Sequence, residues 1–253
     1  MKLALLQFDT ASRAKEQNLR TIEQLMEGVE CDLLLLPEMF ATGYEVDARA
    51  IAEPAKGGAT LAWMHDLARR HNCAVCGTIA VHHKGDYLNR LYFCTPEGEV
   101  FHYDKRHLFT FAGEHHHFTA GKERIIIEWR GVRIMPLVCY DLRFPVWSYL
   151  PGEVDVLLYS ASWAASRISA WDTLLPARAI ENQAWAVGVN RVGEDADHTP
   201  FNGHSAAYDY LGRKMAECGS ESCVRVADID PSKIASFRER FRAWQDADIF
   251  QIR

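Results

Sequence analysis

Three residues that could act as acid, base or nucleophile each follow a short apolar segment. Glu38 comes directly after segment 33–37, Cys139 comes directly after segment 134–138, and Lys105 closely follows a third such segment. Runs of this kind predict buried strands, and open α/β sheets bind ligands at the carboxyl ends of their strands. A carboxylate beside a thiol can take the thiol proton, so this set of residues could support nucleophilic catalysis at a cysteine.

Each of the three residues also has an ordinary structural explanation: a capping carboxylate for Glu38, a surface lysine for Lys105 and a core thiol for Cys139. Cys139 differs because segment 139–145 leaves a strand, turns and reaches Pro145, a residue suited to the first turn of a helix. A sharp turn from strand to helix exposes a nucleophile and directs backbone N–H groups toward it. An ordinary thiol has a pKa of about 8.5, so it needs a base or a nearby positive charge at neutral pH.

Short apolar runs that predict strands alternate along the chain with amphipathic stretches that predict helices. The expected strands are 3–7, 32–36, 73–81, 88–95, 125–129, 132–138, 154–160, 185–191, 205–210 and 223–229. The expected helices lie around 21–26 and over 57–71 and 173–184. No linker-like or low-complexity stretch interrupts this pattern. We therefore expect one α/β domain over residues 1–253, with helices covering the sheets.

The composition excludes several classes of protein. Of 253 residues, 48% are hydrophobic and 25% charged, which predicts a large buried core rather than a disordered or fibrous chain. The 28 basic and 34 acidic residues give a net charge of −6, and no basic run offers a footprint for nucleic acid. The apolar runs are shorter than the ~18 residues that a membrane span needs. Seven scattered cysteines suit a reducing compartment better than a disulfide framework, so we expect a soluble cytoplasmic protein.

Four motifs resemble those of the nitrilase, or carbon–nitrogen hydrolase, superfamily. They are Leu-Leu-Leu-Pro-Glu at 34–38, Tyr-Asp-Lys-Arg-His-Leu-Phe at 103–109, Val-Cys-Tyr-Asp-Leu-Arg-Phe-Pro at 138–145 and Ala-Arg-Ala-Ile-Glu-Asn-Gln at 177–183. The first three carry the Glu-Lys-Cys triad of that superfamily in its order and approximate spacing. Within the superfamily the chain is most similar to the omega-amidase branch, and the resemblance runs from about residue 3 to residue 250.

The resemblance implies a four-layer α-β-β-α sandwich that hydrolyses a small linear amide through a thioester, with water as co-substrate and without metal or cofactor. It assigns Cys139 as the nucleophile, Glu38 as the general base and acid, and Lys105 as the electrostatic stabiliser. The second glutamate of the family corresponds most naturally to Glu114. The Lys105 ammonium and the backbone N–H of Tyr140 are the expected donors to the oxyanion.

The omega-amidase resemblance also implies the substrates, which are 2-oxoglutaramate and 2-oxosuccinamate, and the products, which are ammonia and a 2-oxo dicarboxylate. A carboxylate at the end of the substrate remote from the amide needs a cation or several hydrogen-bond donors when it is bound. Arg143 is a candidate cation, and Tyr44 or Trp163 could complete the pocket. The alternative for Arg143 is a structural ion pair with Asp141 or another buried acid.

Two further motifs do not indicate a site. Cys73 and Cys76 have the spacing of a redox pair, but they lie in a strand-like run whose alternation places them on opposite faces. The histidine run 115–117 could suggest a metal ion, yet adjacent residues do not readily converge on one ion and no second ligand pair accompanies them.

Two alternatives to an omega-amidase stay open: a related hydrolase acting on an N-carbamoyl compound or a nitrile, and a catalytically idle binding module of the nitrilase fold. The intact triad argues against the second. Relatives commonly pair through helices near the nucleophile, here segments 144–149 and 173–183. The tail 237–253 carries the apolar residues Phe237, Phe241, Trp244, Ile249 and Phe250. We expect a homodimer or higher homo-oligomer with the tail at or beside the interface, or else a tail folded back on its own subunit.

Overall fold

The computed structural model describes residues 1–248 and 250–252, so Ile249 of the predicted tail lies outside the described residues. The strands are β1 (Lys2–Gln7), β2 (Leu33–Leu35), β3 (Glu53–Pro54), β4 (Ala74–His83), β5 (Asp86–Cys94), β6 (Val100–Asp104), β7 (Ile127–Trp129), β8 (Val132–Val138), β9 (Val156–Ser160), β10 (Trp185–Val189), β11 (Val192–Glu194), β12 (Pro200–Asn202), β13 (Ala206–Tyr208), β14 (Lys214–Glu217) and β15 (Cys223–Asp228). The α-helices are α1 (Lys15–Leu25), α2 (Ala48–Ile51), α3 (Ala59–His71), α4 (Pro145–Ser148), α5 (Ile168–Asn182) and α6 (Pro231–Arg240). The 3-10 helices are η1 (Thr110–Ala112), η2 (Glu114–His116), η3 (Cys139–Arg143), η4 (Ala165–Arg167) and η5 (Ala243–Asp246).

Two large sheets form the centre of the molecule. The strand order is β15-β1-β2-β4-β5-β6 in the first sheet, where β3 also pairs with β4, and β14-β13-β10-β9-β8-β7 in the second. In each sheet three central strands run parallel, β1-β2-β4 in one and β8-β9-β10 in the other. The strands on either side of them are antiparallel, whereas the short β3 pairs parallel with β4. The carboxyl ends of the parallel strands therefore gather at one edge of each sheet.

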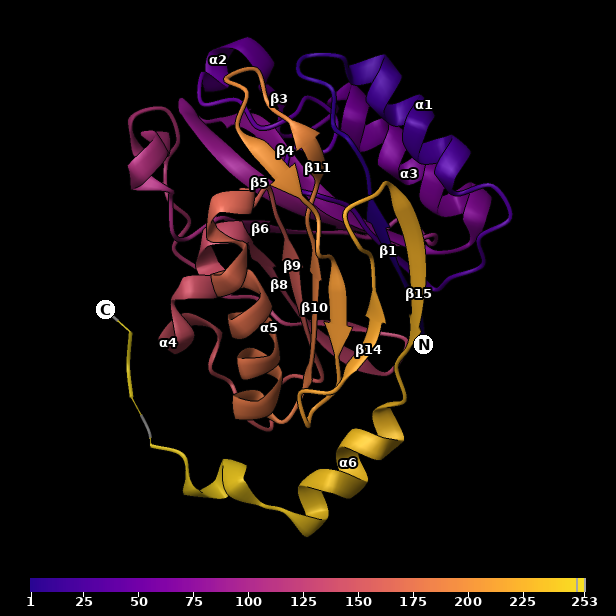
Figure 1. Ribbon diagram of the computed structural model, residues 1–253, viewed down its shortest axis with the longest axis vertical. Helices are drawn as coiled ribbons and strands as arrows, with labels where there is room; N and C mark the ends of the chain where they lie inside the picture. The colour runs from indigo at the N-terminus through magenta and orange to yellow at the C-terminus, as the bar shows by residue number, and fades with distance from the viewer. Residues whose placement is uncertain (249, 253) are drawn as a thin grey trace.

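Helices cover the outer face of each sheet, giving four layers (Figure 1). Side chains along β2 point alternately to the two faces of the sheet. Leu33 and Leu35 belong to the core that joins the two sheets, whereas Leu34 belongs to the cluster under α1 and α3. On the second sheet, Gly188 of β10 lets α5 approach closely, since a Cβ there would lie 2.6 Å from the ring of Trp171. The predicted four-layer sandwich is confirmed.

The expected elements are found, with shifted boundaries. The strand expected over 132–138 is β8, and Pro145 begins α4 as its position predicts. The helix expected from residue 173 begins earlier, at Ile168, because the turn of η4 leads directly into α5. Trp171, which lies before the expected start, is fully buried in the core.

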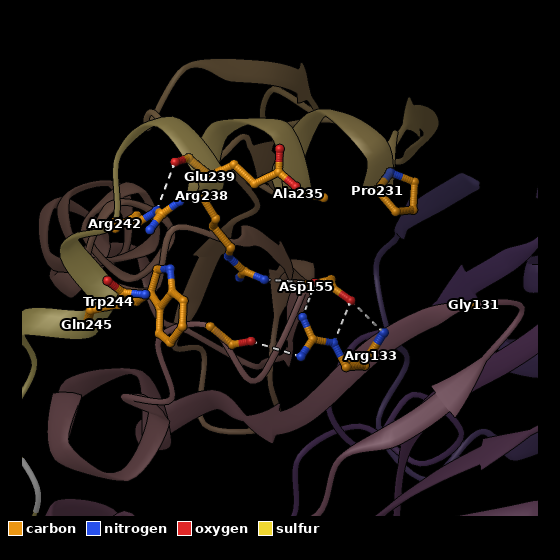
Figure 2. Close-up of a pocket in the computed structure, with 11 residues that line it drawn as sticks. Gly131, Arg133, Asp155, Pro231, Ala235, Arg238, Glu239, Arg242, Trp244 and Gln245 are labelled. Carbon is orange, nitrogen blue, oxygen red and sulfur yellow. Dashed lines mark hydrogen bonds and ion pairs between the residues drawn. The ribbon is translucent and has the colours of Figure 1, made fainter.

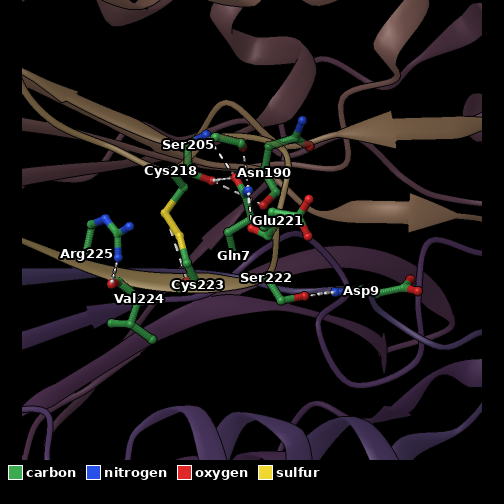
Figure 3. Close-up of a disulfide and its surroundings, with 11 residues drawn as sticks. Gln7, Asp9, Asn190, Ser205, Cys218, Glu221, Ser222, Cys223, Val224 and Arg225 are labelled. Carbon is green, nitrogen blue, oxygen red and sulfur yellow. Dashed lines mark hydrogen bonds between the residues drawn. A yellow bond between two sulfur atoms is a disulfide. The ribbon is translucent and has the colours of Figure 1, made fainter.

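The structure contains one disulfide, although the scattered cysteines suit a reducing compartment better than a disulfide framework. Cys218 and Cys223 are joined as a disulfide across the short connection between β14 and β15, with their Cα atoms 6.4 Å apart (Figure 3). Beside it, the Gln7 side-chain amide donates to the carbonyl oxygens of Gly219 and Glu221, at 2.8 Å each. Cysteine spacing could not show this pairing, because it depends on β14 and β15 belonging to different sheets that meet at this edge.

The helix α6 is held to the sandwich by a buried arginine. Arg238 donates to Asp155 at 3.0 Å and to the carbonyl oxygen of Gln183 at 3.1 Å, and Asp155 also binds Arg133 at 2.7 Å. Arg133, Asp155 and Arg238 line a cavity of about 510 Å³ beside α6, and Trp244 also lines it (Figure 2). The start of the tail is thus fixed to its own subunit.

Beyond α6 the tail runs along the lower edge of the molecule, past α5 toward α4 (Figure 1). The Phe237 ring stacks on Tyr210 at 4.7 Å, and the Phe250 ring lies 6.3 Å from that of Tyr149. Phe241 and Phe250 nevertheless remain 57% and 43% exposed. The tail therefore packs on its own subunit close to the helices of the expected interface, and the oligomeric state stays a prediction.

Candidate active site

The segments directly after β2, β6 and β8 come together between the two facing sheets. Glu38 lies just past β2 of the first sheet, Lys105 directly follows β6 of the same sheet, and Cys139 directly follows β8 of the second. Two hydrogen bonds tie the sheets together here: Glu38 N–H donates to the carbonyl oxygen of Ala161 at 3.2 Å, and Ser160 Oγ donates to that of Leu36 at 2.7 Å. The predicted nucleophile and the predicted base therefore come from opposite sheets.

Lys105 lies between two carboxylates, and all three side chains are fully buried. Its Nζ is 2.8 Å from Glu38 Oε1 and 2.8 Å from Glu114 Oε2. A buried ammonium is tolerated only when it is paired and hydrogen-bonded, and both conditions are met here. The sequence-predicted Glu114, which begins η2, is thus brought into direct contact with Lys105.

Sequence reasoning missed two further partners of the carboxylates. The side-chain amide of Asn89, on β5, donates to Glu38 Oε1 at 2.7 Å and to Glu114 Oε1 at 3.1 Å. The backbone N–H of Ser162 donates to Glu38 Oε2 at 3.0 Å. The only sequence signal was an asparagine beside Arg90 in the largely apolar strand 88–95, and a polar residue of this kind does not identify a site.

Cys139 lies at a turn with an unusual backbone. Its φ angle is +43°, in the left-handed region that residues other than glycine seldom adopt. Asp141, two residues later, is fully buried and its Oδ2 accepts from the N–H of Val138 at 3.0 Å and from the hydroxyl of Tyr103 at 2.8 Å. Backbone strain of this type persists only where surrounding contacts hold it, and Asp141 supplies those contacts at the turn.

The protonation states follow from burial and from the neighbouring charges. Burial, together with the carboxylate of Glu38, raises the pKa of the Cys139 thiol well above its ordinary value. Burial alone would lower the pKa of the Lys105 ammonium, but Glu114 and Glu38 raise it well above the usual range. Burial also raises the pKa of Glu38, an effect that Lys105 opposes and Glu114 reinforces. The cysteine is therefore a thiol at rest, and it needs a base to become a nucleophile.

A cavity of about 170 Å³ opens onto this cluster, with Glu38, Lys105 and Cys139 at its floor. Tyr44 lines it with its ring centre 5.9 Å from Lys105 Nζ, and its buried hydroxyl has no hydrogen-bond partner among the described residues. Burial raises the pKa of Tyr44 well above its ordinary value, so the hydroxyl stays neutral and can donate. Phe111 forms part of the rim and is 85% exposed.

A second, smaller cavity of about 20 Å³ adjoins Cys139 and contains the other predicted residues, Tyr140, Arg143 and Trp163. The Arg143 guanidinium carbon lies 5.0 Å from the centre of the Trp163 ring. The alternative for Arg143, an ion pair with Asp141 or another buried acid, is not found among the described residues, and Asp141 instead accepts from His107 Nδ1 at 2.8 Å and from the backbone and hydroxyl groups given above. Arg167, which the sequence motifs did not indicate, lines both cavities.

The two motifs set aside at the sequence level lie elsewhere. Cys76 belongs to the core between the sheets and Cys73 to the cluster under α1 and α3, as strand alternation predicts. The side chains of His115, His116 and His117 are exposed. Within residues 1–248 and 250–252, no group of three or more histidine, cysteine or acidic side chains is arranged to hold a metal ion. No helix in the same part of the chain is long and apolar enough to cross a membrane.

With this fold and this arrangement of Glu38, Lys105 and Cys139, the chain belongs to the carbon–nitrogen hydrolase family, whose model matches residues 2–239. It is 42% identical to the omega-amidase YafV of Yersinia enterocolitica, over 100% of this chain and 98% of the relative. It is 34% identical to a 2-oxoglutaramate amidase of Bacillus subtilis, over 96% of each chain. The structure of a CN-hydrolase superfamily protein from Xanthomonas campestris, with an arsenic adduct in its active site, superposes with a TM-score of 0.96 at 38% identity, covering 100% of this chain and 99% of the other.

Proposed function

We propose that this carbon–nitrogen hydrolase is a cysteine-dependent omega-amidase, which cleaves 2-oxoglutaramate or 2-oxosuccinamate to ammonia and a 2-oxo dicarboxylate through a thioester. The observation that carries the proposal is one cavity lined by Cys139, Glu38, Lys105 and Arg167, with Arg143 at the small cavity that adjoins Cys139. The names of the Yersinia and Bacillus relatives support the same activity. We also propose that residues 1–253 form a single carbon–nitrogen hydrolase domain and that the protein is cytoplasmic.

In the first half of the reaction, Glu38 takes the proton of the Cys139 thiol and the thiolate attacks the amide carbon. The carbonyl oxygen becomes an oxyanion, which the Lys105 ammonium and the backbone N–H of Tyr140 stabilise, each such donor contributing ~3 kcal/mol. When the intermediate collapses, the C–N bond breaks and Glu38 returns the proton to nitrogen. Ammonia leaves, and the acyl group remains on sulfur as a thioester.

In the second half, Glu38 takes a proton from water, whose oxygen attacks the thioester carbon. The C–S bond breaks, the sulfur recovers a proton from Glu38, and the carboxylic acid is released. One carboxylate can serve as base and acid twice because burial raises the pKa of Glu38 above its ordinary value. The Glu114 contact with Lys105 keeps the ammonium charged and in position throughout.

The size and charge of the cavity support a short anionic substrate. A volume of about 170 Å³ is below the roughly 300–1,000 Å³ of sites for drug-sized ligands, so it suits an acyl chain of a few carbons. Arg143 borders the adjoining cavity with its guanidinium over Trp163, where it could pair with the remote carboxylate. The unpartnered Tyr44 hydroxyl could donate to a polar group of the substrate.

The proposal is tested by measuring ammonia released from a panel that contains 2-oxoglutaramate, pentanamide, an N-carbamoyl amino acid and an aliphatic nitrile. We expect the highest kcat/KM for 2-oxoglutaramate. If the N-carbamoyl compound or the nitrile is preferred, the substrate assignment is wrong while the hydrolase chemistry stands. If none of them releases ammonia above the rate of the Cys139→Ala variant, the protein is not this enzyme.

A further inference from the structure

Arg167 occupies a position that connects the two cavities beside Cys139. It is the last residue of η4, and its side chain is half-buried. The guanidinium carbon lies 4.9 Å from the centre of the Phe109 ring, which walls both cavities. The carbonyl oxygen of Arg167 accepts from the indole N–H of Trp163 at 2.9 Å, and this bond fixes the point from which the side chain extends.

The indole of Trp163 therefore contacts both Arg167 and Arg143. Its N–H holds the backbone of Arg167, and its ring lies under the guanidinium of Arg143. A guanidinium stays charged at every physiological pH, so two positive charges border the small cavity between Cys139 and Trp163.

The guanidinium of Arg167 has few hydrogen-bond acceptors within the described part of the protein. Its only side-chain hydrogen bond among the described residues is a long one, 3.5 Å to Ser166 Oγ. Asp195 also lines the larger of the two cavities, but its Oδ1 already accepts from the backbone N–H groups of Asp197 at 3.0 Å and Thr199 at 2.9 Å. A half-buried cation with donors to spare at a ligand cavity is suited to an anionic ligand.

We propose that Arg167 is a specificity-determining residue that binds, jointly with Arg143, the carboxylate of the substrate remote from the scissile amide. The inference rests on the proposed amidase function and names a residue beyond it. A carboxylate has two oxygens with about four acceptor sites, so two guanidiniums can share it. A neutral amide would leave both cations unpaired in the cavity, and a site built this way rejects the uncharged analogue.

The test is the ratio of kcat/KM for 2-oxoglutaramate to kcat/KM for pentanamide, which has the same chain length and no charge. In Arg167→Met, which keeps the apolar stem over Phe109, we expect this ratio to fall on the order of 100-fold, mainly through KM. Arg167→Lys, which keeps the charge but not the planar fork, should lower it by about 10-fold. Arg225→Met, at an exposed arginine on β15 away from both cavities, is the matched control and should leave the ratio unchanged.

The possible failures are distinguishable. If Arg167→Met and Arg167→Lys both retain the wild-type ratio, or if they reduce both substrates equally while lowering the melting temperature, Arg167 has only a structural role and the inference is overturned. If the wild type itself cleaves pentanamide as efficiently as 2-oxoglutaramate, the proposed substrate class fails instead. Should the methionine variant not fold, the lysine variant alone decides the question.

Discussion

The carboxylate of Asp141 accepts a hydrogen bond from the backbone N–H of His107 at 3.0 Å, and this bond joins the two turns that carry Cys139 and Lys105. Each partner lies two residues beyond its catalytic candidate. Asp141 is fully buried and also holds Val138 N–H and the Tyr103 hydroxyl. One buried side chain outside the cavity therefore joins the turn of the nucleophile to the turn of the ammonium.

Asp141→Asn is expected to separate these two turns. An asparagine presents an NH₂ group where the aspartate accepts from donors, so at least one buried donor loses its acceptor at a cost of ~1–3 kcal/mol. We expect a lower melting temperature and a fall in kcat of about 10–100-fold, measured well below the melting temperature. Tyr103→Phe is the comparison: it leaves the carboxylate in place and removes a hydroxyl that donates to Asp141 and accepts from the indole N–H of Trp147. An unchanged kcat in Asp141→Asn would mean that the aspartate stabilises the fold without positioning the site.

The pH profile should respond to Glu114 in a defined direction. The base form of Glu38 is required, so kcat/KM rises as pH increases through the raised pKa of that carboxyl. The charge of Glu114 contributes to raising this pKa, so Glu114→Gln should shift the acidic limb of the profile to lower pH. We expect kcat at the plateau to fall by about 10–100-fold, because Lys105 loses one of its two carboxylate partners. An acidic limb that moves to higher pH would contradict the charge assignment.

Asn89 should act through the carboxylates rather than on the substrate. Asn89→Leu removes an amide that donates to both Glu38 and Glu114, so two buried carboxylates lose a donor at once. We expect kcat to fall by about 10–100-fold with a much smaller change in KM. Gln17→Leu, at an exposed position of α1, is the control. A large rise in KM at unchanged kcat would place Asn89 in substrate binding instead.

The exposed apolar residues of the tail predict assembly. Phe241, Trp244 and Phe250 remain 57%, 38% and 43% exposed although the tail lies beside α4 and α5. We expect a homodimer in sedimentation at micromolar concentration. Truncation after Arg240 keeps α6 and its buried Arg238, and it should weaken the dimer without unfolding the subunit. A wild-type monomer under the same conditions would refute the dimer.

The sequence predicted the catalytic residues best where each lies in a short contiguous motif. Glu38, Lys105 and Cys139 each follow an apolar strand, and their resemblance to family motifs predicted the triad and the fold. The sequence did not predict Asn89, Ser162 and Arg167. These residues lie at the site only because the two sheets pack face to face and because η4 turns the chain back toward Cys139. Their local sequence carries no signal that distinguishes them from ordinary polar residues.

The central claim is that Cys139 forms a thioester with the acyl group of a 2-oxo acid amide. The most direct measurement compares ammonia and 2-oxoglutarate formed from 2-oxoglutaramate by the wild type and by Cys139→Ala, with intact-protein mass spectrometry of the quenched reaction. We predict equal amounts of both products from the wild type, an acyl adduct that is lost when Cys139 is replaced, and no turnover by a folded Cys139→Ala. Ammonia release by Cys139→Ala at the wild-type rate, or an adduct that persists without Cys139, would contradict the account.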